Sequence, residues 1–152
     1  MRPFRFRAEA ALQMRRREHD RALVMLARAQ AAFVAAQQGV EAAQKAIEHA
    51  DRELHQAMQT PDPQLPLGWY RSWRLKVRED HRAAEARRDA RDKDVREATG
   101  EVSRSRQRVR SLERLRELAV AAWERESRRS DQRTMDALAS MRFARREERT
   151  YQ

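Results

Sequence analysis

The chain has 152 residues, of which 38% are charged and only 6% are aromatic, and its formal net charge is +10. This composition is poor material for a thick globular core and favours long helices with charged flanks. The sequence has no cysteine, which excludes a disulfide framework and a thiolate metal site, and no apolar run approaches the roughly 18 residues that a membrane span needs.

The opening residues, MRPFRFRAEAALQM, carry charges where a secretory signal peptide has its apolar segment. The sequence therefore predicts a cytoplasmic protein. Pro3 precedes the first helical pattern, and the next proline is Pro61. We expect one helix to fill most of the interval, from about residue 5 to residue 59.

A seven-residue repeat runs through this first segment. Large apolar residues dominate one series, and alanine occupies every position of a second series three residues out of step. The first series is Leu12, His19, Leu26, Phe33, Val40, Ile47 and Leu54, and the second is Ala22, Ala29, Ala36, Ala43, Ala50 and Ala57. Because sites three apart share a helical face, the two series predict a coiled-coil seam that a second helix can approach closely.

Most of the residues that break helices stand together in the middle of the chain. Pro61, Pro63, Pro66 and Gly68 all fall in the stretch MQTPDPQLPLGWY. They predict a turn over residues 60–68, and two long helices joined by a short loop become antiparallel neighbours.

A second helix is expected over residues 69–148. Its apolar stripe is predicted to begin with three residues after the turn and to continue at spacings of seven and three, and a later group is predicted to shift the register as a stutter does. The opening group is Tyr70, Trp73 and Val77, the continuation is Val95, Val102, Val109 and Leu112, and the shifted group is Leu115, Leu118 and Ala122. The charged segment 78–94 is interpreted as a solvated helix with opposite charges three or four residues apart.

These elements predict an all-α fold, a long two-helix antiparallel coiled-coil hairpin that forms a single coiled-coil domain over residues 1–152. Counting back from the turn, the first helix runs out opposite about residue 120. The last 30 residues or so of the second helix are therefore expected to overhang.

Net charge is distributed unevenly along the chain. Residues 1–28 and residues 95–152 each carry a net charge of +5, whereas residues 29–60 carry −2 and residues 61–94 carry +2. An antiparallel hairpin brings its first and last segments together, so the sequence predicts a positive base and a nearly neutral tip. A positive base calls for an acidic partner such as nucleic acid, anionic lipid or an acidic protein cavity.

Residue patterns for chemistry on small molecules are absent from the sequence. It offers no glycine-rich loop that could hold phosphate, and its four histidines show no ligand spacing. No carboxylate stands at a spacing that marks general acid–base work. The sequence predicts neither catalysis, nor a cofactor, nor a metal site.

Three motifs stand near the start of the chain, just after the turn and near the end of the second helix. The first is Phe4-Arg5-Phe6 followed by Leu12, Arg15 and Glu18; the second is Tyr70, Trp73 and Val77; the third is Asp131-Gln132-Arg133-Thr134-Met135-Asp136-Ala137-Leu138-Ala139 with Arg142. Together they resemble the FliJ family of flagellar export stalk proteins. Their order and spacing, the chain length and the turn position agree with that family along essentially the whole chain. Ala8 departs from the family pattern, which commonly has a leucine there.

The resemblance implies a non-enzymatic stalk and general chaperone of bacterial flagellum protein export, a type III secretion process that serves flagellum biogenesis, motility and chemotaxis. The implied partners are the hexameric export ATPase FliI, which would receive the base, the export gate protein FlhA and the escort chaperones. Nucleic acid and small-molecule substrates are not implied. The implied location is the cytoplasm, peripherally at the inner membrane.

By the same resemblance, two groups of residues are expected to contact partners. The base group, for the ATPase, is Phe4, Phe6, Arg133, Met135, Asp136, Arg142, Arg145 and Arg146. The tip group, for the gate, is Ile47, Leu54, Tyr70, Trp73 and Val77. The competing interpretation of the tip group is packing between the two helices, and that of the two phenylalanines is anchoring of the chain end.

Three alternatives remain open from the sequence. The equivalent stalk of a virulence type III secretion system would share the fold and the mechanism. A nucleic-acid-binding coiled coil is favoured by 31 arginines, but 24 acidic residues are interleaved with the basic ones and no continuous basic face emerges. A helix lying on a membrane is disfavoured because the apolar stripe is mostly alanine.

Overall fold

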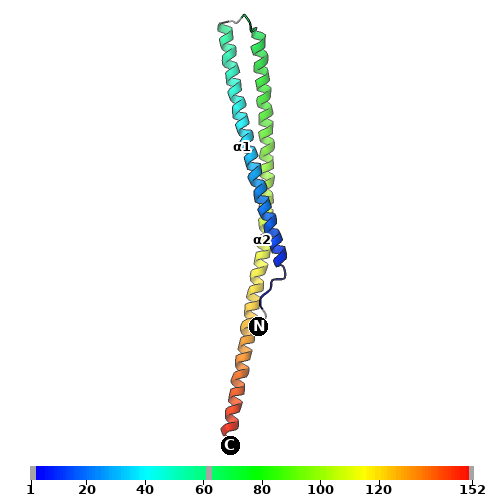
Figure 1. Cartoon of the computed structure of the whole chain (residues 1–152), viewed down its shortest axis with the longest axis vertical. Coiled ribbons are helices and arrows are strands. Elements are labelled where there is room, and N and C mark those ends of the chain that lie inside the picture. Colours follow the sequence, from blue (N-terminus) through cyan, green and yellow to red (C-terminus); the bar gives the residue numbers. More distant parts are fainter. Residues whose placement is uncertain (1–2, 61–62, 151–152) are drawn as a thin grey trace. The chain divides into compact units, whose positions relative to one another are not determined.

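The structure, a computed structural model, describes residues 3–60 and 63–150, and of residues 143–150 it describes the backbone alone. Two long helices pack against each other: α1 spans Glu9–Gln59 and α2 spans Leu67–Thr150 (Figure 1). Within the described ranges there is no strand. The predicted all-α helical hairpin is confirmed.

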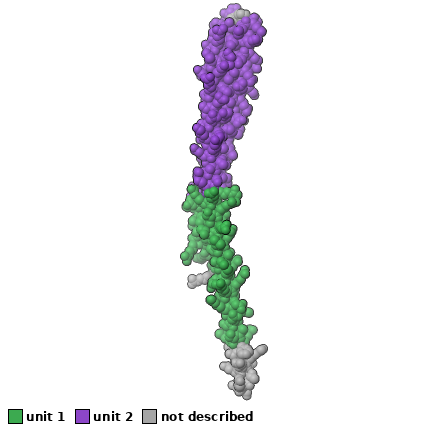
Figure 2. All heavy atoms as spheres, turned by 180° about the vertical axis from the view of Figure 1, so that it is seen from behind, with its two compact units in different colours: residues 1–17, 106–152 green, residues 18–105 purple. Residues whose placement is uncertain are grey.

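The chain divides into two compact units (Figure 2). Their residue ranges show that each unit contains a part of both helices. Unit 1 consists of residues 1–17 and 106–152, and unit 2 consists of residues 18–105. Unit 2 contains the turn and the antiparallel halves of α1 and α2 that the turn connects. The assignment of the whole chain to one coiled-coil domain stays a prediction.

The core of unit 2 is a seam of small side chains. Ala22, Ala50, Ala57, Val77 and Ala84 are at most 8% exposed. Every member of the two heptad series between His19 and Ala57 is buried or half-buried, so the periodicity identified the inner face of α1 correctly. Alanine at these positions lets the helix backbones approach closely, which suits a fold that has few large side chains to bury.

The first helix begins at Glu9, four residues later than the expected start at residue 5. Residues 3–6 are not helical, and their burial alternates: Phe4 and Phe6 are half-buried, whereas Arg5 and Arg7 are exposed. Residues two apart lie on the same side of an extended chain but about 200° apart on a helix. Only the extended form can bury both phenylalanines together, and this preference overrides helix formation.

The turn is shorter than expected because α2 begins at Leu67, two residues before the expected start. The carbonyl of Pro66 accepts a hydrogen bond of 2.8 Å from the Trp69 N–H, so this proline sits at the helix start, where a missing N–H costs nothing. Gly68 lies inside the first turn of α2. Pro61 lies outside the described residues.

The predicted stutter near residue 115 is wrong. Leu115 and Leu118 are 54% and 59% exposed, and Ala122 is exposed as well. Steps of seven from Val109 lead to Arg116 and then to Trp123. Val109 and Trp123 are half-buried, and Arg116 between them is exposed. The sequence pattern missed this register because Arg116, a charged residue, occupies a heptad position that is normally apolar. The Arg116 Nε lies 3.5 Å from the Glu9 carboxylate on the other helix.

Candidate partner-binding surfaces

In the part of the chain that the structure describes, no group of three histidines and carboxylates is placed to hold a metal ion. The hollows include a groove of about 480 Å³ between α1 and α2 in unit 2, lined among others by Ala29, Ala32 and Ala98. No helix within the described ranges is both long and apolar enough to cross a bilayer. The candidate sites considered below are the surfaces predicted to contact partners.

The five residues predicted for the tip lie on or beside the seam of unit 2. Val77 is 8% exposed, and Ile47, Leu54, Tyr70 and Trp73 are half-buried. The Trp73 ring packs edge-on against His49, with ring centroids 5.4 Å apart at an angle of 84°. This environment agrees with packing between the two helices, and contact of these side chains with a partner stays a prediction.

Ion pairs reinforce the same part of the hairpin. The Asp51 carboxylate on α1 accepts a hydrogen bond of 2.5 Å from the Arg74 Nε on α2, and an Arg78 nitrogen lies 3.7 Å from its other oxygen. Both arginines lie within the first turns of α2. The tip is thus fixed by aromatic packing and by charge across the two helices.

A separate set of apolar side chains at the tip faces solvent, and we call it the tip cluster. Its members are Met58, Leu65, Leu67 and Trp69, which are 61%, 38%, 36% and 47% exposed. The Trp69 ring meets the Tyr70 ring edge-on, with centroids 5.1 Å apart, and lies tilted against the Trp73 ring, with centroids 5.4 Å apart, so it rests on two half-buried aromatics. Sequence reasoning missed this set as a site, although Met58 and Trp69 each stand one residue away from a heptad position.

The predicted phenylalanines of the base are packed within unit 1. The Phe4 ring meets the Trp123 ring edge-on, with centroids 6.1 Å apart and an interplanar angle of 61°. The Phe6 carbonyl accepts a hydrogen bond from the Glu9 N–H at 3.2 Å, which joins the extended segment to the start of α1. Trp123 had not been identified from the sequence, and the heptad count through Arg116 is the signal that finds it.

A salt bridge fastens the two chain segments of unit 1. An Arg16 nitrogen lies 2.6 Å from the Glu113 carboxylate, across 97 residues of sequence. Both side chains border an open hollow that also includes Val120 and Ala121. The amino-terminal segment is therefore anchored on α2 by rings and by charge.

Beyond this anchor, the C-terminal part of α2 presents its side chains to solvent. Residues 131–142 are exposed without exception, and they include the predicted Arg133, Met135, Asp136 and Arg142. Met135, Leu138 and Met141 follow one another at spacings of three and are 65%, 48% and 61% exposed. The side chains of the predicted Arg145 and Arg146 lie outside the described residues.

The net charge of the protein belongs to unit 1. Unit 2 contains 15 basic and 15 acidic residues, whereas unit 1 contains 19 basic and nine acidic residues. The sequence had predicted a positive base and a nearly neutral tip from the hairpin topology. When the charges are counted for each unit, unit 2 is neutral and unit 1 carries the whole net charge of +10.

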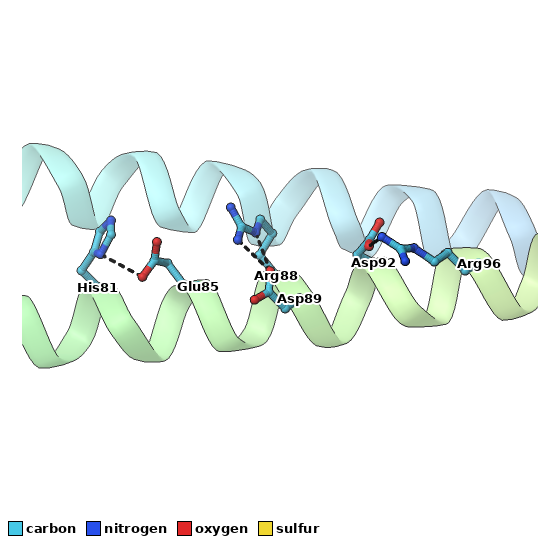
Figure 3. A network of polar contacts seen from close by, with 6 residues as sticks. All are labelled: His81, Glu85, Arg88, Asp89, Asp92 and Arg96. Atoms are coloured by element: carbon cyan, nitrogen blue, oxygen red, sulfur yellow. Dashed lines mark hydrogen bonds and ion pairs between the residues drawn. The ribbon is translucent and has the colours of Figure 1, made fainter.

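Within unit 2, many charged residues of α2 form ion pairs with residues one to four positions away on the same helix. His81, Glu85, Arg88, Asp89, Asp92 and Arg96 form local contacts on α2, in the region where it runs beside α1 (Figure 3). The hydrogen bond to Asp89 raises the pKa of the Arg88 guanidinium. The predicted helical structure of segment 78–94, with opposite charges three or four residues apart, is confirmed.

Comparison with known protein families gives one match over nearly the whole chain. A sequence model of a family described as "Flagellar FliJ protein" matches residues 6–148. No curated protein and no solved structure matches the chain. The match agrees with the resemblance carried by the three sequence motifs.

Proposed function

Because this chain belongs to the flagellar FliJ family, whose members are non-enzymatic stalk or chaperone components of flagellar protein export, we propose a finer role for it. It acts as a stalk that inserts unit 1 into the ring of the hexameric export ATPase. It also contacts the membrane export gate through the tip of unit 2 and binds the escort chaperones. It works in the cytoplasm, peripherally at the inner membrane.

The observation that carries this proposal is the segregation of charge. Unit 1 holds the whole net charge of +10, and its C-terminal helix exposes Arg133, Asp136 and Arg142 together with Met135. A basic unit that exposes apolar side chains at regular spacing suits an acidic protein cavity, because charge guides the encounter and apolar contacts hold the complex.

The tip offers a surface of different character for the gate. Unit 2 has no net charge, and the exposed Trp69 stands on the half-buried pair Tyr70 and Trp73. Aromatic side chains held by their neighbours are typical centres of binding energy in interfaces. Ile47, Leu54 and Val77 contribute by fixing this arrangement from the seam.

The first experiment measures ATP turnover by the cognate export ATPase with increasing amounts of this protein. The chain should raise the turnover, and the double variant Arg133→Glu/Arg142→Glu should lose this effect most strongly at low ionic strength. Trp69→Ala serves as the matched control and should stimulate normally. If the unaltered chain leaves turnover unchanged at every ratio, the stalk proposal fails.

The second experiment measures binding to the cytoplasmic part of the gate. Trp69→Ala should weaken this binding, while the double arginine variant should bind as the unaltered chain does. Circular dichroism of both variants should show unchanged melting, because all three substituted side chains are substantially exposed. Loss of the same partner by both variants would contradict a division of roles between the units.

A further inference from the structure

The stretch of α1 between Ala22 and Val40 has apolar residues on its outer side as well as on the seam, and its only polar residues are Arg28, Gln30, Gln37 and Gln38. It contains a single charged residue, Arg28, in a chain that is 38% charged. Its inner face lies on the seam with α2. The opposite face, which we call the outer face of α1, consists of Leu23, Val24, Ala27, Ala31, Val34, Ala35, Gln38 and Ala42.

This outer face is open to solvent in the structure. Leu23, Val24 and Val34 are 44%, 52% and 54% exposed, and the alanines between them are exposed as well. A helix that carries apolar residues on both of its faces is typical of one that is covered on both. In the structure α2 covers the inner face alone, so the outer face is free to receive a further element.

We propose that the outer face of α1 is an interface with a second copy of this chain, packed antiparallel on the same face of its partner. The proposal does not depend on the role in export, because it concerns unit 2 and uses residues outside the tip cluster and outside unit 1.

Charge complementarity identifies a second copy as the occupant. Asp20 and Lys45 lie just beyond the two ends of the outer face, on the same side of the helix and at equal distances from the midpoint of that face between residues 32 and 33. In an antiparallel pair, residue Asp20 of each copy therefore stands opposite Lys45 of the other. Neither side chain has a salt-bridge or hydrogen-bond partner within the described residues.

The overall charge is also compatible with this arrangement. Two chains that each carry +10 repel one another, but this charge lies in unit 1, and unit 2 is neutral. The alanines of the outer face allow two helix axes to approach closely, with the valines and leucines packing between them. The face extends over about 30 Å, which is small for a stable dimer, so association should be weak and concentration-dependent.

The first test is sedimentation velocity of the full chain over a wide range of concentrations. The chain should shift from monomer to dimer as concentration rises. Val34→Glu should weaken the dimer and raise its dissociation constant about tenfold or more. Leu118→Glu is the matched control, since it alters an equally exposed apolar residue of unit 1 and should leave dimerisation intact. A chain that stays monomeric at every concentration overturns the proposal.

A charge exchange tests the identity of the partner. Asp20→Lys and Lys45→Asp should each weaken the dimer, and the double variant should restore it, because the pair is then reversed on both copies. Asp20 and Lys45 are both exposed, so the variants should keep their helical fold, and circular dichroism measures their helix content. Failure of the double variant to recover dimerisation overturns the antiparallel arrangement.

The absence of cysteine permits a direct test of direction and register. Ala27 and Gln38 should face each other across the interface, whereas two copies of either residue should lie about 16 Å apart, too far for a disulfide. Under oxidising conditions, a mixture of Ala27→Cys and Gln38→Cys chains should therefore cross-link, and neither variant alone should. Ala86→Cys on α2 is the control that should remain uncross-linked in any mixture. Cross-linking of Ala27→Cys with itself would indicate a parallel pair and overturn the proposal.

Discussion

The two helices of unit 2 lie side by side, yet the surfaces that they expose to solvent differ in charge. Residues 22–40 of α1 include one charged side chain, whereas residues 84–102 of α2, which lie opposite them, include 11. On α2, charged side chains pair along the helix, as Arg91 does with Asp94 at 2.9 Å. The comparison shows that the exposed surface of α2 is charged, whereas that of α1 is mostly apolar, which is the basis for the proposed interface.

Both helices nevertheless share one requirement, a seam of small apolar residues. Ala84 of α2 is 3% exposed, and Ala86, two residues later, is exposed. The exposure of an alanine in α2 therefore changes completely within two residues, depending on whether the side chain faces α1 or solvent. Substitutions can distinguish the seam, the charged surface of α2 and the exposed surface of α1.

The largest effect is expected for Ala84→Glu. A carboxylate at this seam position would lose its hydration without a partner, and we expect a loss of about 3 kcal/mol or more in the free energy of unfolding. Ala86→Glu places the same side chain on the solvated surface of α2 and should change stability by less than about 0.5 kcal/mol. Thermal or urea unfolding followed by circular dichroism measures both. Equal losses would show that the assigned seam is incorrect.

A gain is expected for Gly39→Ala on α1. Gly39 lies inside the helix, and an added Cβ would meet no atom within 4 Å. Alanine should therefore stabilise the chain by about 0.5–1 kcal/mol, because glycine has the greater conformational entropy in the unfolded state. The same unfolding measurement applies, and a destabilised variant would show that this position is more crowded than the structure indicates.

A smaller effect is expected for Asp92→Asn on α2. This change removes the ion pair with Arg96, whose nitrogen lies 2.5 Å from the carboxylate on the helix surface. Exposed pairs of this kind contribute a few tenths of a kcal/mol and are screened by salt. The difference between variant and parent should shrink as ionic strength rises. On α1, Gln38→Asn provides a matched change that should show no dependence on salt.

The smallest effect concerns Lys76 on α2, whose ammonium group donates a 2.9 Å hydrogen bond to Asp80. This contact raises the pKa of Lys76 above 10.5, first through the hydrogen bond and then through the charge of Asp80. A raised lysine pKa stabilises the folded state below pH 10.5, and this stabilisation is lost as pH rises through the raised value. NMR titration of the lysine side chain should show the shift, and Asp80→Asn should remove it.

Much of unit 2 could be predicted from the sequence because its periodicity is undisturbed. The heptad series from His19 to Ala57 identified the inner face of α1, and the prolines located the turn. The tip group was different: the aromatic pattern identified Trp73 as a candidate contact, but the pattern alone cannot separate a half-buried ring from an exposed one such as Trp69.

Unit 1 was harder to predict because its contacts join distant segments. Phe4 and Trp123 are separated by more than a hundred residues, and nothing local indicates that their rings meet. The extended conformation of residues 3–6 and the continuation of the heptad through Arg116 both depend on this neighbouring surface. Local helix signals therefore gave a helix that begins too early and a stutter that does not exist.

The sequence by itself determined that this protein is a pair of long helices joined by a proline-rich turn. Heptad spacing and helix breakers act through local backbone geometry, which needs no distant partner. Only the tertiary structure decided which apolar side chains remain exposed, among them the tip cluster, the outer face of α1 and the C-terminal stretch of α2. Exposure depends on which element covers which face, and that is a property of contacts between segments far apart in the chain.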